Sequence, residues 1–297
     1  MQSSLICIAD IDLLKSRSKI LNLNINFKKI QSLKSAKENK LGTVQFIQAG
    51  KCKDLEPGTL NPKNSKYVLD NLNFGIAESL KNKKVGLVTG PIQKSNIIDG
   101  GFKRFQGHTE WIKKKTQSDH VVMLLSSKKI KVALATTHVP LAEVPKNIQK
   151  SKLVEIIKIL HSGLKAKFKI RYPVITVLGL NPQAGEDGKM GKEEIKIINP
   201  AVQICRNIGI DASYAISADT AFNTEKLKQT DAYLAMYHDQ ALPVLKALSF
   251  GEAVNITLGI PIVRTSVDHG TALDIAGKMK PNLGSIKQAI KSAEIQL

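Results

Sequence analysis

Two histidines stand where apolar, strand-like runs of the sequence end. His138 follows the run 131–137, and His238 follows the run 232–237. Imidazoles that arrive from the ends of separate strands are typical of catalytic metal sites, in which one coordination position stays open to substrate. A histidine at a strand end is also commonly a hydrogen-bonded structural residue, and the residues alone leave both interpretations open.

Charged and amide side chains are set into the apolar C-terminal part of the chain. Lys246, Asn255 and Arg264 are single polar groups within such segments. A half-buried lysine or arginine needs a partner, because an unpaired buried charge is costly. An anionic substrate would supply that partner, and a structural carboxylate such as Asp239 or Glu252 is the local alternative.

A second candidate for anion binding is the polar turn Gly107–Glu110, which leads into a helix-like segment containing Trp111. A His-Thr pair at the start of a helix can hold a phosphate or carboxylate group. An N-cap formed by Thr109 explains the same residues equally well. The local sequence does not decide between the two.

Strand-like and helix-like segments alternate along the chain, a pattern that predicts an α/β fold. Strands are expected at 5–9, 85–89, 174–180, 232–237, 253–258 and 262–267, with a hairpin formed by 120–127 and 131–137. Helices are expected at 144–164, 193–207, 271–276 and 285–295, and surface loops at 22–66. Polar loops follow four strands, at 90–94, 138–145, 181–188 and 238–240. The carboxyl ends of strands are where α/β sheets bind ligands.

Size and composition are those of an ordinary globular protein. The 297 residues, 42% hydrophobic and 23% charged, can bury a large core. The net charge of +19 raises the alternative of nucleic-acid binding. Only five of the 44 basic residues are arginines, the lysines are scattered, and aromatic residues make up 5% of the chain. Platforms for base stacking are therefore scarce, and we expect no nucleic-acid partner.

Several signals of location and cofactor class are missing from the sequence. No apolar run is long enough to span a bilayer, and the N-terminus lacks the pattern of a signal peptide. Cys7, Cys52 and Cys205 lie far apart, which fits a reducing cytoplasm rather than a disulfide framework or a zinc knuckle. The glycine-rich Rossmann turn, the Walker sequence and the serine nucleophile elbow are absent. A dinucleotide would therefore bind outside the usual Rossmann turn.

Six groups of motifs follow one another along the chain: Leu87–Lys94 (LVTGPIQK), Gly107–Glu110 (GHTE), Ala135–Leu141 (ATTHVPL), Leu178–Glu186 (LGLNPQAGE), Ala218–Thr220 (ADT) and the C-terminal runs 236–246, 254–259 and 262–277. In their order and spacing the chain resembles the 4-hydroxythreonine-4-phosphate dehydrogenase family of vitamin B6 biosynthesis, from about residue 5 to the C-terminus. The segment Asp268–Gly277 also resembles the cofactor loop of the isopropylmalate and isocitrate dehydrogenases.

The resemblance implies a two-lobed α/β fold like that of isocitrate and isopropylmalate dehydrogenases, with mixed sheets and a central cleft. Lobe 1 is expected to comprise 1–105 with 245–297 and to lie on the cofactor side. Lobe 2 is expected to comprise 106–244 and to carry the metal, substrate and dimer contacts. A homodimer with its active site near the interface is the expected assembly.

The activity implied by the resemblance is a metal-dependent oxidation at a CH–OH group, with NAD or NADP as cofactor. The substrate is 4-phosphooxy-L-threonine (4-hydroxy-L-threonine 4-phosphate), and the product is 2-amino-3-oxo-4-phosphooxybutanoate, which decarboxylates to 3-amino-2-oxopropyl phosphate. Such an enzyme is a cytoplasmic oxidoreductase of pyridoxine 5'-phosphate biosynthesis. Its divalent metal is zinc, magnesium, manganese or cobalt.

The family's functional positions fall on particular residues of this chain. The metal-ligand positions are His138, Gln183 and His238, and the catalytic positions are Lys246 and Asp219. Substrate contacts are expected from His108, Thr109, Lys246, Asn255 and Arg264, and cofactor contacts from His269, Gly270, Thr271 and Asp274.

The chain departs from the family pattern at three places. Gln183 stands where the family has histidine, and glutamine binds metal through a neutral, harder and weaker donor than imidazole. We therefore expect weaker zinc binding and a relative shift toward magnesium or manganese. The family's first strand and Gly/Pro-rich turn are not found before Leu5, which predicts an exposed sheet edge. Gln93 stands where histidine or asparagine is usual.

Two other functions are compatible with these motifs. The first is a related dehydrogenase that acts on another phosphorylated 3-hydroxy acid, which competing substrates in a dehydrogenase assay would reveal. The second is a degenerate family member that folds or dimerises without turnover, which Gln183 and the short N-terminal segment favour.

Overall fold

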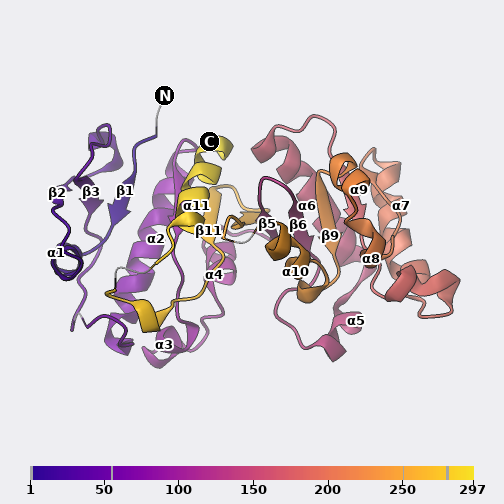
Figure 1. Cartoon of the computed structure of the whole chain (residues 1–297), viewed down its shortest axis with the longest axis horizontal. Helices are drawn as coiled ribbons and strands as arrows, with labels where there is room; N and C mark the ends of the chain where they lie inside the picture. Colours follow the sequence, from indigo (N-terminus) through magenta and orange to yellow (C-terminus); the bar gives the residue numbers. More distant parts are fainter. Residues whose placement is uncertain (1–2, 55, 250, 279–280) are drawn as a thin grey trace. The chain divides into compact units, whose positions relative to one another are not determined.

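The structure is a computed structural model, and it describes residues 3–54, 56–249, 251–278 and 281–297. The chain divides into two units. The first comprises Met1–Leu87, Pro91–Thr116 and His269–Leu283, and the second comprises Val88–Gly90, Gln117–Asp268 and Gly284–Leu297. Each unit has its own sheet and helices (Figure 1).

The first unit is built on a parallel three-stranded sheet in the order β1-β3-β2. Its strands are β1 (Ile6–Ile8), β2 (Asn26–Lys29) and β3 (Thr43–Ile47). Its helices are α1 (Ile11–Ile20), α2 (Ser65–Lys81), α3 (Lys94–Asp99) and α4 (His108–Lys115), with short 3-10 turns η1 (Leu33–Ser35), η2 (Pro62–Asn64) and η6 (Leu273–Ile275).

Strands β2 and β3 lie in the region 22–66, which was expected to contain surface loops and for which the sequence predicted no strand. Strand β2, Asn-Phe-Lys-Lys, exposes most of its residues and has no apolar alternation to reveal it. Strand β3 buries Gln45 together with Phe46 and Ile47. The Gln45 amide exchanges hydrogen bonds with the backbone of Lys37, which satisfies a polar group that the pattern alone would place outside.

The second unit contains an eight-stranded mixed sheet in the order β4-β11-β10-β5-β6-β9-β7-β8. Its strands are β4 (Gly86–Thr89, of which Gly86 and Leu87 are grouped with the first unit), β5 (Val122–Ser126), β6 (Lys131–Leu134), β7 (Val174–Val177), β8 (Asp211–Ala212), β9 (Ala232–Ala235), β10 (Val254–Leu258) and β11 (Val263–Val267). Strands β5 and β6 form the predicted antiparallel hairpin. Strands β6, β9, β7 and β8 run parallel, so the α/β prediction with mixed pairing is confirmed.

Helices cover both faces of the mixed sheet. The principal ones are α5 (Val144–Asn147), α6 (Lys150–Phe168), α7 (Asn199–Asn207), α8 (Ala218–Ala221), α9 (Thr224–Gln229), α10 (His238–Ser249) and α11 (Gly284–Gln296). Because side chains alternate across a strand, Leu124 belongs to a buried cluster with residues of α6, α7 and α11, and Leu125 belongs to a second cluster with residues of α10. Figure 1 shows α10 beside β6 and β9, which it contacts.

Helix α6 shows why this core forms. Leu153, Ile157, Leu160 and Leu164 recur at helical spacing and are at most 1% exposed. Truncating one such leucine to alanine typically costs about 2–5 kcal/mol. The predicted helix 144–164 is interrupted, because Ile148 takes an extended backbone conformation between α5 and α6.

Two further helix predictions and one loop prediction differ from the structure. The segment 193–207 begins with a π-helical stretch, η5 (Glu194–Ile198), before α7. The predicted helix 271–276 contains only the 3-10 turn η6, because Ala272 adopts a left-handed φ of 46°. His238 begins α10, with Met236 and Tyr237 between it and the end of β9, where the sequence predicted a polar loop at 238–240.

The grouping of the C-terminal strands differs from the expected lobes, which divided the chain at 244/245. Strand β10 pairs with β5 along its whole length, and β11 pairs with β10. These pairings join 254–267 to the unit that also holds β6, β7 and β9. Within the described ranges, no helix combines the length and the apolar character that crossing a membrane requires.

Candidate functional site

The three predicted metal positions follow three neighbouring strands of the mixed sheet. His138 follows β6, His238 follows β9, and Gln183 follows β7. Strand β9 lies between the other two and is parallel to both. Because the carboxyl ends of parallel strands meet at one edge of a sheet, the fold brings all three positions to the same edge.

Polar contacts tie these three strand ends together. The Thr136 hydroxyl donates to the Met236 carbonyl at 2.7 Å, which joins the residues just before the two histidines. The Gln240 carboxamide accepts a hydrogen bond from the Met236 N–H at 2.7 Å and donates to the Gly179 carbonyl at 2.5 Å. Sequence reasoning missed Gln240. Its place two residues after His238 was the available signal.

The His138 and His238 rings lie beside each other, with their centroids 5.9 Å apart. Imidazole nitrogens bond zinc at about 2.0–2.1 Å, so two rings at this separation can reach one ion. His238 Nδ1 lies 3.0 Å from Asp239 Oδ1. A proton on Nδ1 makes this contact a hydrogen bond to carboxylate and leaves the Nε2 lone pair for a metal. Asp239 therefore orients a histidine, where the sequence considered it as a partner for Lys246 or Arg264.

Gln183 lies in the turn η4 (Pro182–Gly188) with an exposed side chain and a left-handed φ of 50°. Among the described residues, no three His, Cys, Asp or Glu side chains are grouped so that they could hold a metal. With two imidazoles and the Gln183 amide oxygen, the donor set fits a divalent cation of intermediate hardness.

Asp219 stands close to the same edge of the sheet. It lies in the first turn of α8, which contacts the turn η4. The backbone N–H of Gly179 donates to the Ile216 carbonyl at 2.8 Å, which brings the start of this segment to the end of β7. The Ser217 hydroxyl makes a short hydrogen bond to Asp219 Oδ1. One carboxylate oxygen is therefore held in place while the residue remains exposed.

Asn255 and Arg264 share the sheet face that α10 covers. Asn255 is paired with Leu125 on β5 and with Ser266 on β11, and directly opposed residues project to the same side. Arg264 is two residues from Ser266 and so projects to that side as well. The same side holds Leu125 packed with Leu245 of α10.

Arg264 is 2% exposed and is held by two threonines. Its Nη1 donates to Thr257 Oγ1 at 3.1 Å, and its Nη2 donates to Thr89 Oγ1 at 2.9 Å. The buried Oδ1 of Asn255 accepts no hydrogen bond from the part of the chain that the structure describes. An unsatisfied buried acceptor calls for a donor from a ligand or from water. Lys246 is exposed, near the end of α10.

The other predicted substrate contacts, His108 and Thr109, belong to the first unit. They are the first two residues of α4, and both are half-buried. Gly107 precedes them with a φ of 148°. The Trp111 indole anchors this helix to α2 by donating to Asn73 Oδ1 at 2.9 Å. The Thr109 side chain makes no N-cap hydrogen bond, because the cap position is Gly107.

The predicted cofactor residues also lie in the first unit, in and around η6. The Thr271 hydroxyl donates to Gln93 Oε1 at 3.0 Å, and Gln93 Nε2 donates to Ser95 Oγ at 3.3 Å. His269 Nδ1 lies 2.9 Å from the Gly270 carbonyl oxygen. Asp274 lies in the turn η6. Gln93, one of the sequence departures, thus holds the loop that contains Thr271.

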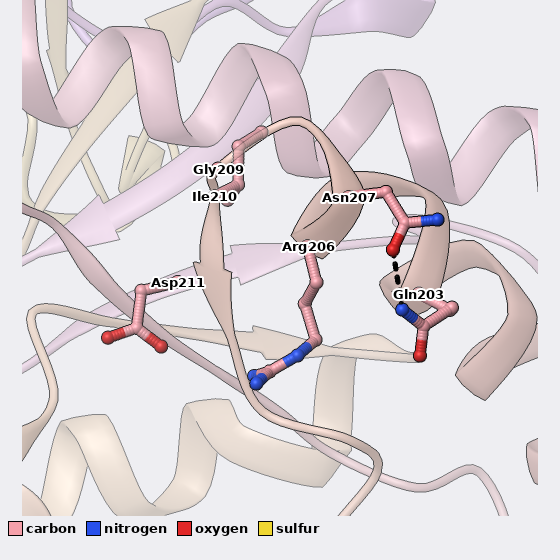
Figure 2. Close-up of a pocket in the computed structure, with 6 residues that line it drawn as sticks. All are labelled: Gln203, Arg206, Asn207, Gly209, Ile210 and Asp211. Atoms are coloured by element: carbon pink, nitrogen blue, oxygen red, sulfur yellow. Dashed lines mark hydrogen bonds between the residues drawn. The ribbon is translucent and has the colours of Figure 1, made fainter.

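A surface hollow of about 420 Å³ lies elsewhere, at the end of α7 and the turn into β8 (Figure 2). It is lined by Gln203, Arg206, Asn207, Gly209, Ile210 and Asp211, none of which the sequence analysis selected. The Arg206 guanidinium already donates to the Ala212 carbonyl at 2.8 Å and lies over the Tyr214 ring. The hollow therefore does not present a free cation for a ligand.

The chain is similar to known proteins over almost its whole length. A family model described as pyridoxal phosphate biosynthetic protein PdxA matches residues 1–293. A 4-hydroxythreonine-4-phosphate dehydrogenase from Pseudoalteromonas translucida is 43% identical over 291 residues, which are 98% of this chain and 88% of the relative. The Chromobacterium violaceum protein of the same name is 45% identical over 289 residues, 97% of this chain and 87% of the relative.

Solved structures show the same likeness. A 4-hydroxythreonine-4-phosphate dehydrogenase from Klebsiella pneumoniae matches with a TM-score of 0.85 and 30% identity, over 97% of this chain and 89% of that chain. The Burkholderia phymatum structure of the same name matches with a TM-score of 0.83 and 32% identity, over 98% of this chain and 87% of that chain. A terephthalate 1,2-cis-dihydrodiol dehydrogenase from Burkholderia xenovorans matches with a TM-score of 0.66 and 18% identity, over 98% of this chain and 96% of that chain. At this identity the match supports the fold alone. By the full-length family match and these identities, the chain belongs to the PdxA family of pyridoxal phosphate biosynthetic proteins.

Proposed function

We propose that this chain oxidises the C3 alcohol of 4-hydroxy-L-threonine 4-phosphate with NAD or NADP. The hydride passes from C3 to the nicotinamide and the hydroxyl proton is lost, giving 2-amino-3-oxo-4-phosphooxybutanoate. Loss of carbon dioxide then yields 3-amino-2-oxopropyl phosphate for pyridoxine 5'-phosphate synthesis. The observation that carries the proposal is the pair of imidazoles, His138 and His238, at the ends of adjacent parallel strands in a chain of this family.

The metal-binding residues of the proposal are His138, His238 and Gln183. A divalent ion, when bound, supplies Lewis-acid polarisation of an alcohol or carbonyl oxygen. Asp239 fixes the His238 ring through Nδ1, and the Thr136–Met236 hydrogen bond fixes the spacing of the two strand ends. These contacts hold the His238 ring and the two strand ends in place before any ligand arrives, which reduces the cost of binding.

The proposed anion contacts are Arg264, Asn255, His108 and Thr109. The Arg264 guanidinium presents planar donors that suit a phosphate or carboxylate. The unsatisfied Oδ1 of Asn255, on the same sheet face, can accept from the substrate's ammonium or hydroxyl group. His108 and Thr109, at the start of α4, can donate to a phosphate.

Lys246 and Asp219 are the residues to which we assign proton transfer. Both side chains are exposed, so each can exchange protons with solvent between turnovers. The hydrogen bond from Ser217 to Asp219 Oδ1 leaves Oδ2 as the atom available to take a proton. A positioned acid or base of this kind contributes about 10²–10⁴-fold to a rate.

We assign the nicotinamide cofactor to the loop of His269, Gly270, Thr271 and Asp274. Support comes from its likeness to the cofactor loop of the isopropylmalate and isocitrate dehydrogenases and from the contact that holds Thr271 on Gln93. The proposed assembly is a homodimer, and the proposed location is the cytoplasm. In the described part of the chain Cys7, Cys52 and Cys205 are free thiols, which supports a reducing compartment.

The proposal is tested with purified protein, 4-hydroxy-L-threonine 4-phosphate, NAD or NADP and added divalent metal, by following the reduced nicotinamide. We expect turnover of this substrate to exceed that of other phosphorylated 3-hydroxy acids when they compete in one assay. Preference for another such acid would move the chain to the related dehydrogenase activity. Absence of turnover with every substrate would favour the degenerate family member, the function that Gln183 makes the leading alternative.

A further inference from the structure

The turn that carries Gln183 has an unusual backbone. Five consecutive residues, Gln183 to Asp187, have φ between 43° and 81°. Four of them are not glycine, and left-handed helical geometry costs an L-amino acid about 1–2 kcal/mol per residue. Such a run persists only where the surrounding structure holds it, and held strain of this kind clusters at functional sites.

The Glu194 carboxylate is the group that holds the start of this turn. Glu194 is 2% exposed. Its Oε1 accepts hydrogen bonds from the backbone N–H groups of Leu180 at 2.7 Å and Asn181 at 2.8 Å. Its Oε2 accepts from Asn181 Nδ2 at 3.0 Å. A buried carboxylate with three donors is satisfied without a cation, so its local role is to anchor 180–181.

The same carboxylate also lies close to the backbone in the middle of the turn. A Cβ added to Gly185 would lie 2.6 Å from Glu194 Oε2, and one added to Gly179 would lie 3.1 Å from Oε1. The carboxylate therefore sits between the end of β7 and the left-handed residues. Glu194 is also the first residue of the π-helical stretch η5, a form that frequently occurs at functional sites.

We propose that Glu194 is a positioning residue that holds the left-handed turn and so presents Gln183 to the His138–His238 pair. The inference rests on the proposed function, because the ligand role of Gln183 belongs to it. Glu194 acts through the backbone. It accepts a hydrogen bond from the Asn181 N–H on one side of Gln183, and its carboxylate lies close to the Gly185 backbone on the other side. The turn is then already in its metal-binding conformation, and binding need not order it.

The test measures binding of Mn²⁺ to the metal-free protein by calorimetry, for wild type and Glu194→Gln. The substitution keeps the size of the side chain but places an N–H₂ group against Asn181 Nδ2. The Asn181 amide cannot simply turn over, because Nδ2 also donates to Glu193 Oε2 at 2.8 Å. Changes to residues that support metal ligands typically cost 10–100-fold in metal affinity, and we expect Glu194→Gln to lose about 10-fold or more.

Two comparisons separate positioning from general destabilisation. The matched control is Glu38→Gln, the same change at an exposed site of the first unit, for which we expect Mn²⁺ affinity within about twofold of wild type. The second comparison places Glu194→Gln on a Gln183→Ala background. Since no amide ligand then remains to be positioned, the loss caused by Glu194→Gln should disappear. Asn181→Ala, which retains the backbone donors, serves if Glu194→Gln does not fold and should weaken Mn²⁺ binding in the same direction.

The outcomes distinguish this inference from the proposed function. A folded Glu194→Gln protein that binds Mn²⁺ as tightly as wild type contradicts the positioning role alone. An equal loss of affinity on the Gln183→Ala background also contradicts it, because Glu194 would then act elsewhere. A wild-type protein that binds no divalent ion contradicts the proposed metal site and this inference with it.

Discussion

The imidazole rings of His138 and His238 lie with their centroids 5.9 Å apart because β6 and β9 pair in parallel and end at the same edge of the sheet. The proximity is therefore a consequence of strand register. One hydrogen bond, from Thr136 to the Met236 carbonyl, extends the pairing to within two residues of both histidines. The account of the metal site depends on this relationship.

Replacing one of these rings should abolish tight metal binding. His238→Ala removes one imidazole donor and leaves Asp239 without its partner. We expect divalent-metal affinity to fall at least about 100-fold, with dehydrogenase turnover falling in parallel. Calorimetric titration of the metal-free protein measures this. His120→Ala, an exposed histidine outside the site, is the control and should bind metal as wild type does.

Restoring an imidazole at position 183 should change the metal preference. Gln183→His replaces a neutral oxygen donor with a nitrogen donor, and imidazole suits zinc better than an amide does. We expect zinc affinity to rise by more than 10-fold, with a smaller change for magnesium. Competition titrations with a zinc chelator give the ratio. Zinc binding no tighter than in wild type would count against Gln183 as a ligand.

The contact between Gln93 and Thr271 should tune cofactor affinity. Gln93→Ala removes the acceptor of the Thr271 hydroxyl and frees the loop that we assign to NAD(P). A hydrogen bond of this kind contributes about 1 kcal/mol, so we expect about fivefold weaker cofactor binding. Fluorescence titration with the reduced nicotinamide measures it. Thr271→Val should give the same loss, and the double variant should lose little more, because both changes break one interaction.

Replacing Arg264 should weaken substrate binding, because its guanidinium donates through two separate nitrogens. Arg264→Lys keeps the charge, but a single ammonium cannot bridge Thr89 and Thr257 while facing a substrate anion. Hydrogen bonds to charged groups are worth about 1.5–3 kcal/mol, so KM for the phosphorylated substrate should rise about 10–100-fold. Arg206→Lys, at the surface hollow, is the matched control. An unchanged KM in Arg264→Lys would remove Arg264 from the substrate site.

Lys167 should give the protein a pH-dependent stability at alkaline pH. Its ammonium donates to the Thr257 carbonyl at 3.3 Å and the Ile262 carbonyl at 3.0 Å, and burial lowers its pKa from 10.5 to about 8. The folded protein therefore loses this proton before the unfolded chain does. Between about pH 8 and 10.5 the unfolded state binds more protons, so this residue's contribution to stability rises with pH.

Lys167→Met isolates that contribution. The difference in unfolding free energy between wild type and variant, from urea titrations at pH 7 and pH 10, should shift in favour of wild type at pH 10. Other groups that titrate in this range act equally on both proteins and cancel in the difference. A difference that is independent of pH would show that the pKa of Lys167 is not lowered by folding.

Much of the sheet edge that carries the candidate metal site could be predicted from the sequence, and particular residues show why. His138 and His238 each follow a continuous apolar run, and such runs identify buried strands in an α/β protein. The pairing order β6-β9-β7, which brings these ends together, depends on contacts between distant segments. Local pattern carries no information about that order.

Other features could not be predicted because their causes are remote in sequence. The left-handed turn at 183–187 contains one glycine within its five φ-positive residues, and the backbone just before it is hydrogen-bonded to Glu194, 13 positions further along the chain. The partner of Arg264 Nη2 is Thr89, 175 positions away. Strand β2 was missed because its exposed lysines hide the period of a strand.

The central claim is that this chain is a metal-dependent dehydrogenase despite the Gln183 substitution. The most direct test strips the purified protein of metal and adds magnesium, manganese, cobalt or zinc in turn, with 4-hydroxy-L-threonine 4-phosphate and NAD or NADP present. The account predicts no reduced nicotinamide without metal and renewed formation with at least one ion, magnesium or manganese being favoured relative to zinc. A folded, metal-loaded protein that forms none with any ion would contradict it.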